Sequence, residues 1–338
     1  MGFKRFDPQD FLVSADAVSS TVWSGNSPEL TAFYTSSAQY QQARKYYLSV
    51  YQTASNNPSA EVQFDIAYAH RYGSGSLFYN SAVTGSSPAS TIYGQYRSLI
   101  LEDENSQFSF GGVNQDYFYV INVSRARYKE KLLPGSLNLV LSGSTTPLRL
   151  TDNSRDVSLP IYYGTQRAYQ IVSGSDGTAY NKATGGTGYT PASGSYGLFL
   201  PDISVILLNG KALDLASPSG VALNTNLSSN VDGNNPVKLY NSIVSGSSFE
   251  LNSEETITSD FVFVRARNAE FNYSENPSFI SGSTGEVIYP YFINSPQVYP
   301  TTVGLYNDAN ELLAVAKLSR PLQKNFTKEA LVRVKLDF

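Results

Sequence analysis

The chain has 338 residues, a formal net charge of −4, a single His, a single Met and no Cys. The lack of Cys excludes a cysteine nucleophile, a disulfide scaffold and an iron–sulfur cluster, and a typical zinc site lacks its ligands. With 24 Lys+Arg spread thinly, we expect no nucleic-acid partner.

The polarity of the chain comes from uncharged side chains rather than from charge. Charged residues make up 15% of the sequence, below the roughly 25% of soluble domains. Aromatic residues make up 13%, mostly as 25 Tyr and 18 Phe. Tyr gives large contact area with a polar tip, which suits interfaces, although it also simply fits pleated strands. We therefore expect a β-rich protein that assembles with others.

The N-terminal third predicts a hairpin followed by a helix. Residues 46–51 and 62–68 both alternate apolar and polar side chains, with a turn at 54–60. A helix is expected from Pro88 to about Leu101, capped by Ser87. Its expected buried face consists of Ile92, Tyr96, Leu99 and Ile100.

The middle third predicts further strands and one long loop. Residues 117–123 read as a strand, and we expect an edge strand that can pair with a neighbouring chain. A strand is also expected at 137–141. Residues 172–197 are rich in Gly, Ser and Thr, which predicts a long functional or mobile loop. The strand 205–208 runs into Asn209-Gly210, which predicts a hairpin turn, and a polar stretch over 217–236 follows.

The last third has the most regular alternation. Residues 261–267 and 331–338 predict strands, and 302–306 with 312–318 predict a hairpin around the loop 307–311. One sheet face is expected to combine the alternate residues of 331–338 with Val303, Leu305, Leu313 and Val315.

These patterns indicate a mainly β fold of antiparallel, β-sandwich-like domains with long polar loops and one or two short helices. We expect three domains, at residues 1–115, 116–216 and 217–338. No membrane insertion is expected, because the most apolar stretch, 197–208, is interrupted by Pro201 and Asp202.

Catalytic patterns are weak throughout. A Ser–His–Asp triad has to use His70, which lies at a strand end with no nucleophile elbow nearby. The densest carboxylates, Glu102 with Glu104 and Glu254 with Glu255, lie in polar connections. The segments 152–156 and 232–235 resemble calcium ligands only in part, because neither completes the twelve-residue loop. We expect no enzyme, cofactor or metal.

Three stretches carry a family resemblance: 260–279, 301–321 and 330–338. They resemble the virion structural proteins of T4-like cyanophages and related marine myoviruses, the VrlC-like group. The hairpin Val303–Asp308 followed by Leu313–Lys317 is also similar to phage tail-collar fibre proteins. The resemblance implies a tail or baseplate protein, localised to the virion after assembly in the host cytoplasm.

We therefore expect a structural component of a contractile tail, in the baseplate or at a tail-fibre attachment, present in multiple copies and bound to other tail proteins. The alternatives are a receptor- or glycan-binding module, motivated by exposed Tyr and the loop 172–197, and a neck or capsid-associated protein. The expected interface residues are Arg125, Arg127, Lys129, Lys131, Tyr306 and Phe338. For the basic segment the favoured alternative is a solvated strand end, with Arg127 and Lys131 paired to Glu130 and nearby acidic residues.

Overall fold

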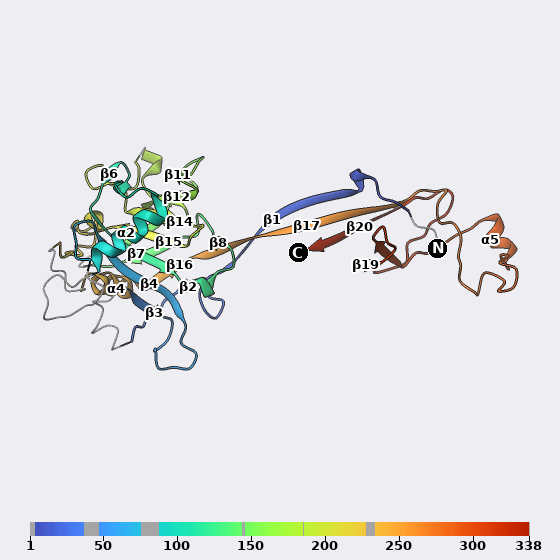
Figure 1. The fold of residues 1–338 in the computed structure, drawn as a ribbon, viewed down its shortest axis with the longest axis horizontal. Coiled ribbons are helices and arrows are strands. Elements are labelled where there is room, and N and C mark those ends of the chain that lie inside the picture. Colours follow the sequence, from blue (N-terminus) through green and yellow to red (C-terminus); the bar gives the residue numbers. More distant parts are fainter. Residues whose placement is uncertain are drawn as a thin grey trace. The chain divides into compact units, whose positions relative to one another are not determined.

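The computed structural model describes residues 4–36, 47–75, 88–143, 146–184, 186–227 and 234–337. The chain forms two compact units: a terminal unit, Met1–Ala17 with Thr256–Phe338, and a central unit, Val18–Glu255. The boundary falls inside strands β1 (Phe11–Thr21) and β17 (Asn252–Ala266) (Figure 1). The expected domains 1–115 and 217–338 each contribute residues to both units. The bounds of the compact units therefore differ from the expected domain bounds.

The central unit is built on one curled antiparallel sheet of twelve strands. Its path runs β2-β16-β9-β10-β12-β14-β15-β7-β4-β3, and β11 and β13 pair with β12. The bounds are β2 Glu29–Leu30, β3 Leu48–Tyr51, β4 Val62–His70, β7 Tyr117–Val123, β9 Asn138–Leu141, β10 Leu148–Asp152, β11 Ile161–Tyr163, β12 Gln166–Ser175, β13 Thr178–Ala179, β14 Gly197–Leu200, β15 Val205–Asn209 and β16 Ser248–Glu250.

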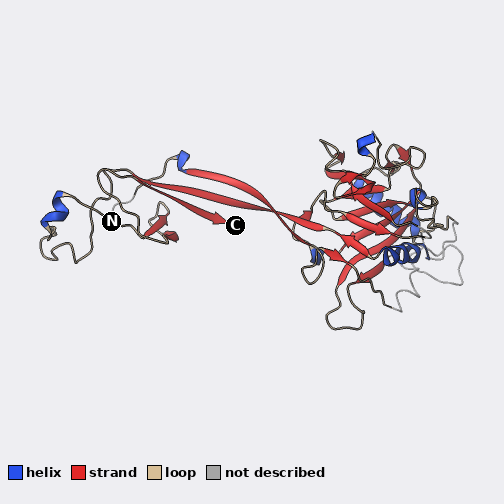
Figure 2. Ribbon diagram, turned by 180° about the vertical axis from the view of Figure 1, so that it is seen from behind, coloured by secondary structure: helices blue, strands red, loops and turns tan. Residues whose placement is uncertain are grey.

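Short elements complete this unit. Three helices pack against strands of the sheet: α2 (Ala89–Ile100), α3 (Gly210–Leu213) and α4 (Asn234–Gly246). Short strands and 3-10 turns fill the connections: β5 Ser109–Phe110, β6 Val113–Asn114, η2 Arg125–Arg127, β8 Lys131–Leu132 and η3 Lys182–Thr184. Figure 2, with strands in red, shows how far strand predominates.

The two ends of the curled sheet are linked by one short segment. Glu29 and Leu30 pair with β16 at one end of the path. Four residues later Tyr34 exchanges both backbone hydrogen bonds with Tyr51 of β3, at 2.9 and 2.8 Å, at the other end. The segment therefore satisfies backbone groups at both sheet edges, which otherwise attract foreign strands.

Both faces of the sheet are buried at its central strand β7. On β7, Tyr119 and Ile121 point into a cluster that includes Leu239 of α4, whereas Phe118 and Val120 point into a cluster with Ile92 of α2. Because successive residues of a strand face opposite sides, a strand covered on both sides is apolar at nearly every position. This explains the continuous run at 117–123.

The expectation that β7 is an edge strand is wrong. It pairs with β15 on one side and with β4 on the other, over five and seven residue pairs. A continuous apolar run is the pattern of a covered central strand rather than of an edge, which polar residues usually protect.

The first hairpin and the helix are confirmed. Strands β3 and β4 pair antiparallel around the predicted turn, and α2 covers Ala89–Ile100. One residue of the expected helix face is wrong: Leu99 is 46% exposed, and Tyr93 is buried in its place. Ser87, the expected cap, lies outside the described residues.

Two turn predictions in the middle third are wrong. The Asn209 side chain accepts a hydrogen bond from the Lys211 amide at 3.1 Å, so Asn209 caps helix α3 instead of turning a hairpin. The segment 172–197 is no single long loop, because it includes the end of β12, then β13, η3 and the first residue of β14. Helix α4 was not predicted, because the polar stretch 217–236 hides its first turn.

The terminal unit contains the sheet β1-β17-β20, with β20 at Ala330–Asp337, and the separate hairpin of β18 (Thr302–Tyr306) and β19 (Leu312–Lys317). It also has η1 (Pro8–Asp10) and α5 (Pro290–Asn294). Strands β17 and β20 pair in register from Ser259↔Asp337 to Ala266↔Ala330. The C-terminal strand and hairpin predictions are confirmed.

The expected apolar face of this unit is half wrong. Val303 and Leu305 pack on the small core of Val262 and Val334, as expected, but Leu313 and Val315 are exposed. The register shifts at Leu305/Tyr306, so that Leu305 faces Ala314 while Tyr306 faces Leu312. This bulge exchanges the two faces of β19 and turns Ala314 and Ala316 inward.

The mainly β, antiparallel fold class is confirmed, with four short α-helices within the described residues. Within that part of the chain, none of the helices has both the length and the apolar character needed to cross a bilayer.

Two glycine substitutions test the packing of the central unit. Gly194 has a φ of +78°, and a Cβ there would lie 2.0 Å from the carbonyl oxygen of Phe110. We expect Gly194→Ala to lower the free energy of unfolding by at least about 2 kcal/mol, through backbone strain and overpacking. Gly94, inside α2, has open space around its Cβ position. Gly94→Ala should raise the free energy of unfolding by about 0.5–1 kcal/mol. Urea unfolding measures both, and equal effects would contradict this packing.

Candidate interface residues

The basic segment follows β7 and begins as a 3-10 turn. The guanidinium of Arg125 lies 4.8 Å from the ring centroid of Tyr128. It also donates to the carbonyl oxygens of Tyr128 and, at 2.6 Å, of Lys129. Arg125 thus holds the turn that leads from β7 into β8, and its charge rests partly on backbone carbonyls of its own segment.

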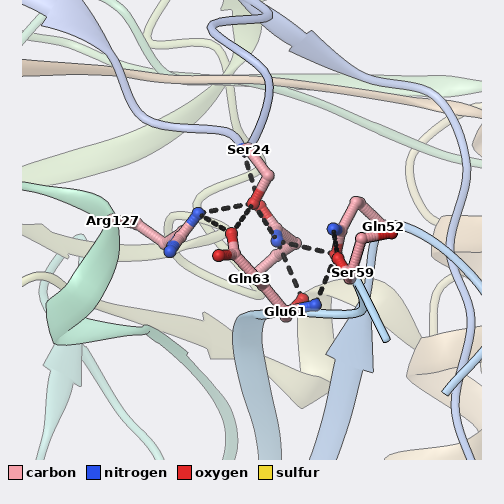
Figure 3. A network of polar contacts seen from close by, with 6 residues as sticks. All are labelled: Ser24, Gln52, Ser59, Glu61, Gln63 and Arg127. Carbon is pink, nitrogen blue, oxygen red and sulfur yellow. Dashed lines mark hydrogen bonds and ion pairs between the residues drawn. The ribbon is translucent and has the colours of Figure 1, made fainter. Parts of the chain in front are cut away.

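Arg127 is pinned by the network in Figure 3. Its Nη1 lies 2.6 Å from Oε2 of Glu61 and also donates to the Ser24 hydroxyl. The hydrogen bond from Ser24 and the positive charge of Arg127 lower the pKa of Glu61. Because the Glu61 side chain is half exposed, solvent weakens this ion pair.

Gln63, next to this ion pair, is fully buried and fully hydrogen-bonded. Its Nε2 shares two N–H groups among three acceptors within hydrogen-bond distance: the Ser24 hydroxyl at 2.7 Å, Oε1 of Gln52 at 3.1 Å and the Glu61 carbonyl at 2.8 Å. Its Oε1 accepts from the Ser24 amide at 3.0 Å. One amide group thus joins the turn at Ser24 to strand β4 (Figure 3). A buried polar group in this position is stabilising only while every partner remains.

The two lysines of the segment form ion pairs with the start of β17. Lys129 Nζ lies 2.8 Å from Glu255, and Lys131 Nζ lies 3.1 Å from Glu254 and 3.6 Å from Glu130. The hydrogen bond between Lys131 and Glu254 raises the pKa of Lys131. Residues Lys131 and Glu254 are register partners in the pairing of β8 with β17.

The segment is therefore largely neutralised by this chain's own carboxylates and carbonyls. Lys131 pairs with Glu130, as the favoured alternative expected, whereas the partner of Arg127 is the sequence-distant Glu61. A pairing of this kind reduces the net charge that an acidic partner would meet. The assignment of Arg125, Arg127, Lys129 and Lys131 to an interface stays a prediction.

The two remaining interface candidates belong to the terminal unit. Tyr306 is partly exposed at the end of β18, next to the bulge. Phe338 lies outside the described residues. Sequence reasoning missed Phe11, Leu12 and Val13, which are 51%, 54% and 67% exposed at the start of β1. Three consecutive apolar residues in an almost uncharged strand are the signal that could have found them.

The catalytic candidates are held in ordinary structural roles. His70 stacks on Tyr117 with ring centroids 6.0 Å apart, and its Nδ1 accepts from the Tyr72 amide at 3.1 Å. Burial lowers the pKa of His70. Among the carboxylates, Glu254 and Glu255 pair with lysines, and Glu102 is exposed after α2. The expectation of no catalytic activity stays a prediction.

The partial calcium-like segment at 152–156 is also structural. Asp152 is buried and accepts from the amides of Gly135 and Ser154. Asp156 accepts from the Ala179 amide and pairs with Lys182 at 2.7 Å. Within the described residues, no group of three or more His, Asp or Glu side chains gathers as a metal site.

A polar cleft of about 190 Å³ is lined by residues of β16, β9 and β10, by the end of β12 and by the turn that follows β12. Register places Ser248 opposite Val140 and Val140 opposite Arg149, so they form one row. Asn138 donates to Asp176 at 2.8 Å and to Glu250 at 2.9 Å beside that row. Arg149 is exposed, and its guanidinium has no ion pair within the described residues. The cleft therefore presents donors and acceptors side by side.

Comparison with known proteins gives no family for this chain: no family model, no curated protein and no solved structure matches it.

A substitution of Gln63 tests the network in Figure 3. Gln63→Leu keeps the side-chain volume but leaves the Ser24 amide without its acceptor. We expect a loss of about 1–3 kcal/mol in the free energy of unfolding, the cost of an unsatisfied buried polar group. The measurement is the urea midpoint. The matched control is Gln166→Leu in β12, which should change the free energy of unfolding by less than about 0.5 kcal/mol. A midpoint unchanged in both variants would refute the role given to Gln63.

Proposed function

We propose that this protein is a structural subunit of a contractile-tailed bacteriophage virion, in the baseplate or at a tail-fibre attachment, acting through protein–protein interfaces. One observation carries the proposal. The three stretches that resemble virion structural proteins, 260–279, 301–321 and 330–338, all belong to the terminal unit. They supply most of its β17–β20 pairing and its β18–β19 hairpin. Weaker likeness extends to 117–141 and 194–213 in the central unit, but the specific stretches gather in the terminal unit, as those of a shared assembly module would.

The surface of the terminal unit supports the same proposal. Its buried cluster consists of Val262, Leu305 and Val334, while Leu313 and Val315 are exposed. Exposed apolar surface of this kind is typical of a unit that is covered in its assembled state. The chain has no Cys and one His, the side chains that most readily act as nucleophile and general base near neutral pH, which also suits a component that binds rather than reacts.

Labelling of purified virions tests this proposal. Antibodies raised against the protein should bind at the tail end in electron micrographs, and the density of the chain should be traceable there. Labelling confined to the neck or capsid would refute the baseplate assignment in favour of the neck or capsid alternative. Absence of the protein from purified virions would refute the structural role itself. As a control, antibodies against a tail protein of known position are applied to the same virions and should bind at that position.

The polar cleft favours a second candidate, a host glycan-binding site. Its wall is formed by Gly174, Ser175 and Asp176, which belong to the segment 172–197. Arg149 with the carboxylates of Asp176 and Glu250 interleaves donors and acceptors, which matches the hydroxyls of a neutral saccharide.

A glycan array tests this second candidate. If the cleft binds saccharides, the native protein should bind specific glycans on the array. Arg149→Ala should reduce this binding at least about tenfold, because it removes a hydrogen-bond donor of the cleft. Arg320→Ala, an exposed arginine of the terminal unit, is the matched control and should leave the binding unchanged. Signals that survive Arg149→Ala, or no signal from the native protein, would contradict glycan binding at this cleft.

A further inference from the structure

The terminal unit has far less core than its length requires. Its two segments contain 17 and 83 residues. Among its described residues, the buried apolar side chains are Val262, Phe292, Leu305, Ala330 and Val334. A domain of about 100 residues normally buries most of the surface that its unfolded chain exposes, and its stability depends on that burial. This unit therefore needs apolar cover from outside itself.

Strand β1 is one open edge of the unit. In the order β1-β17-β20, its one strand partner among the described residues is β17. Phe11, Leu12 and Val13 are all exposed, and because they are consecutive they expose both faces of the strand. Of its eleven residues only Asp16 is charged, and none is Pro. Natural edge strands are protected by charge, Pro or cover, so an unprotected edge of this length predicts a strand partner.

Strand β20 is the other open edge. It pairs with β17 over eight residues, and no described residue pairs with its opposite side. The residues facing the small core are Val332, Val334 and Leu336. Arg333 and Lys335 project to the other face, where both lie over the ring of Phe261, at 5.2 and 5.9 Å. A partner strand would therefore meet an apolar row on one face and cationic groups on the other.

The two edges are complementary in charge. Asp16 has no hydrogen bond or ion pair within the described part of the chain, and Arg333 has no carboxylate partner there. Lys335 is already paired with Asp337 at 2.9 Å. If β1 paired with another β1, Asp16 would meet no cation. If β20 paired with another β20 so that Arg333 met Lys335 or its own counterpart, like charges would lie opposite each other, which is destabilising.

The apolar rows also match. With Asp16 opposite Arg333, Ala15 and Ala17 fall opposite Val332 and Val334, whether the two strands run parallel or antiparallel. This follows from the two-residue repeat of a strand, because Asp16 and its neighbours alternate between the faces as Arg333 and its neighbours do. Small side chains facing branched ones on the core side extend the apolar cluster of the unit without overpacking.

We propose that the partner of the terminal unit is a second copy of this chain, with β1 of one copy adding to β20 of the next through an Asp16–Arg333 pair. Such an interface is heterologous, so its repetition closes into a ring when the rotation between copies allows it. The inference deepens the proposed function by naming the partner, and it explains how apolar cover is supplied without a different protein.

A charge exchange in the full chain tests the interface. Light scattering coupled to gel filtration should show a mass above the 36.9 kDa of one chain. Asp16→Arg and Arg333→Asp should each weaken association at least about tenfold, and the double variant should restore it. The matched control is Asp308→Arg in the exposed β18–β19 turn, which should leave the mass unchanged. Circular dichroism establishes that each variant folds.

Hydrogen exchange gives an independent reading. Amides of residues 11–17 should gain protection as the protein concentration rises, because the free edge of β1 then becomes hydrogen-bonded. A chain that stays monomeric up to about 100 µM, well above the dissociation constant of a stable complex, would overturn the proposal. An oligomer whose mass is the same in the native protein, in Asp16→Arg and in Arg333→Asp would also overturn it. Neither result affects the virion labelling, and absence from virions would leave the self-association measurements intact.

Discussion

The central unit depends on one constraint: a long antiparallel sheet has to satisfy the backbone at its two edges. The segment from Glu29 to Tyr34 meets this constraint by pairing with β16 at one end and with Tyr51 at the other. Once the path is curled and linked in this way, its inner and outer faces enclose different clusters, and each needs its own helices. The position of α2 on one face and of α4 on the other follows from this curling.

Low charge has a second consequence in this chain. Some of its few charged residues fix local structure: Arg127 binds Glu61 and Ser24, and Lys131 binds Glu254. The more numerous amides and hydroxyls extend these contacts, as the Gln63 amide does with Ser24, Gln52 and Glu61. Charge pairs are weak where solvent reaches them, so the buried amide contributes the specificity of this network and the ion pair adds to it.

The sequence predicts elements well where local pattern and tertiary environment agree. Alternation identifies the β3–β4 and β18–β19 hairpins and the pairing of β17 with β20, because one face of each is covered and the other is not. It fails where the environment decides. An apolar run such as β7 does not reveal whether it is an edge or a centre, and Asn209 can turn a hairpin or cap a helix.

The candidate site shows the same limit. The basic residues at 125–131 are visible in the sequence, but their acidic partners Glu61 and Glu254 are about 65 to 125 positions away, so charge neutralisation could not be predicted. The bulge at Leu305/Tyr306 reverses the faces of β19, and a single extra residue in a strand leaves no compositional signal.

The two units differ in the state of their strand edges. In the central unit the path of the sheet ends in backbone pairs at Glu29 and Tyr34, and its clusters are enclosed on both faces. In the terminal unit β1 and β20 remain open and apolar side chains face solvent. Edges of the second kind lower the stability of an isolated chain and raise its tendency to associate. A sequence retains such edges when association is part of its function. This argument favours our proposal that the terminal unit mediates assembly.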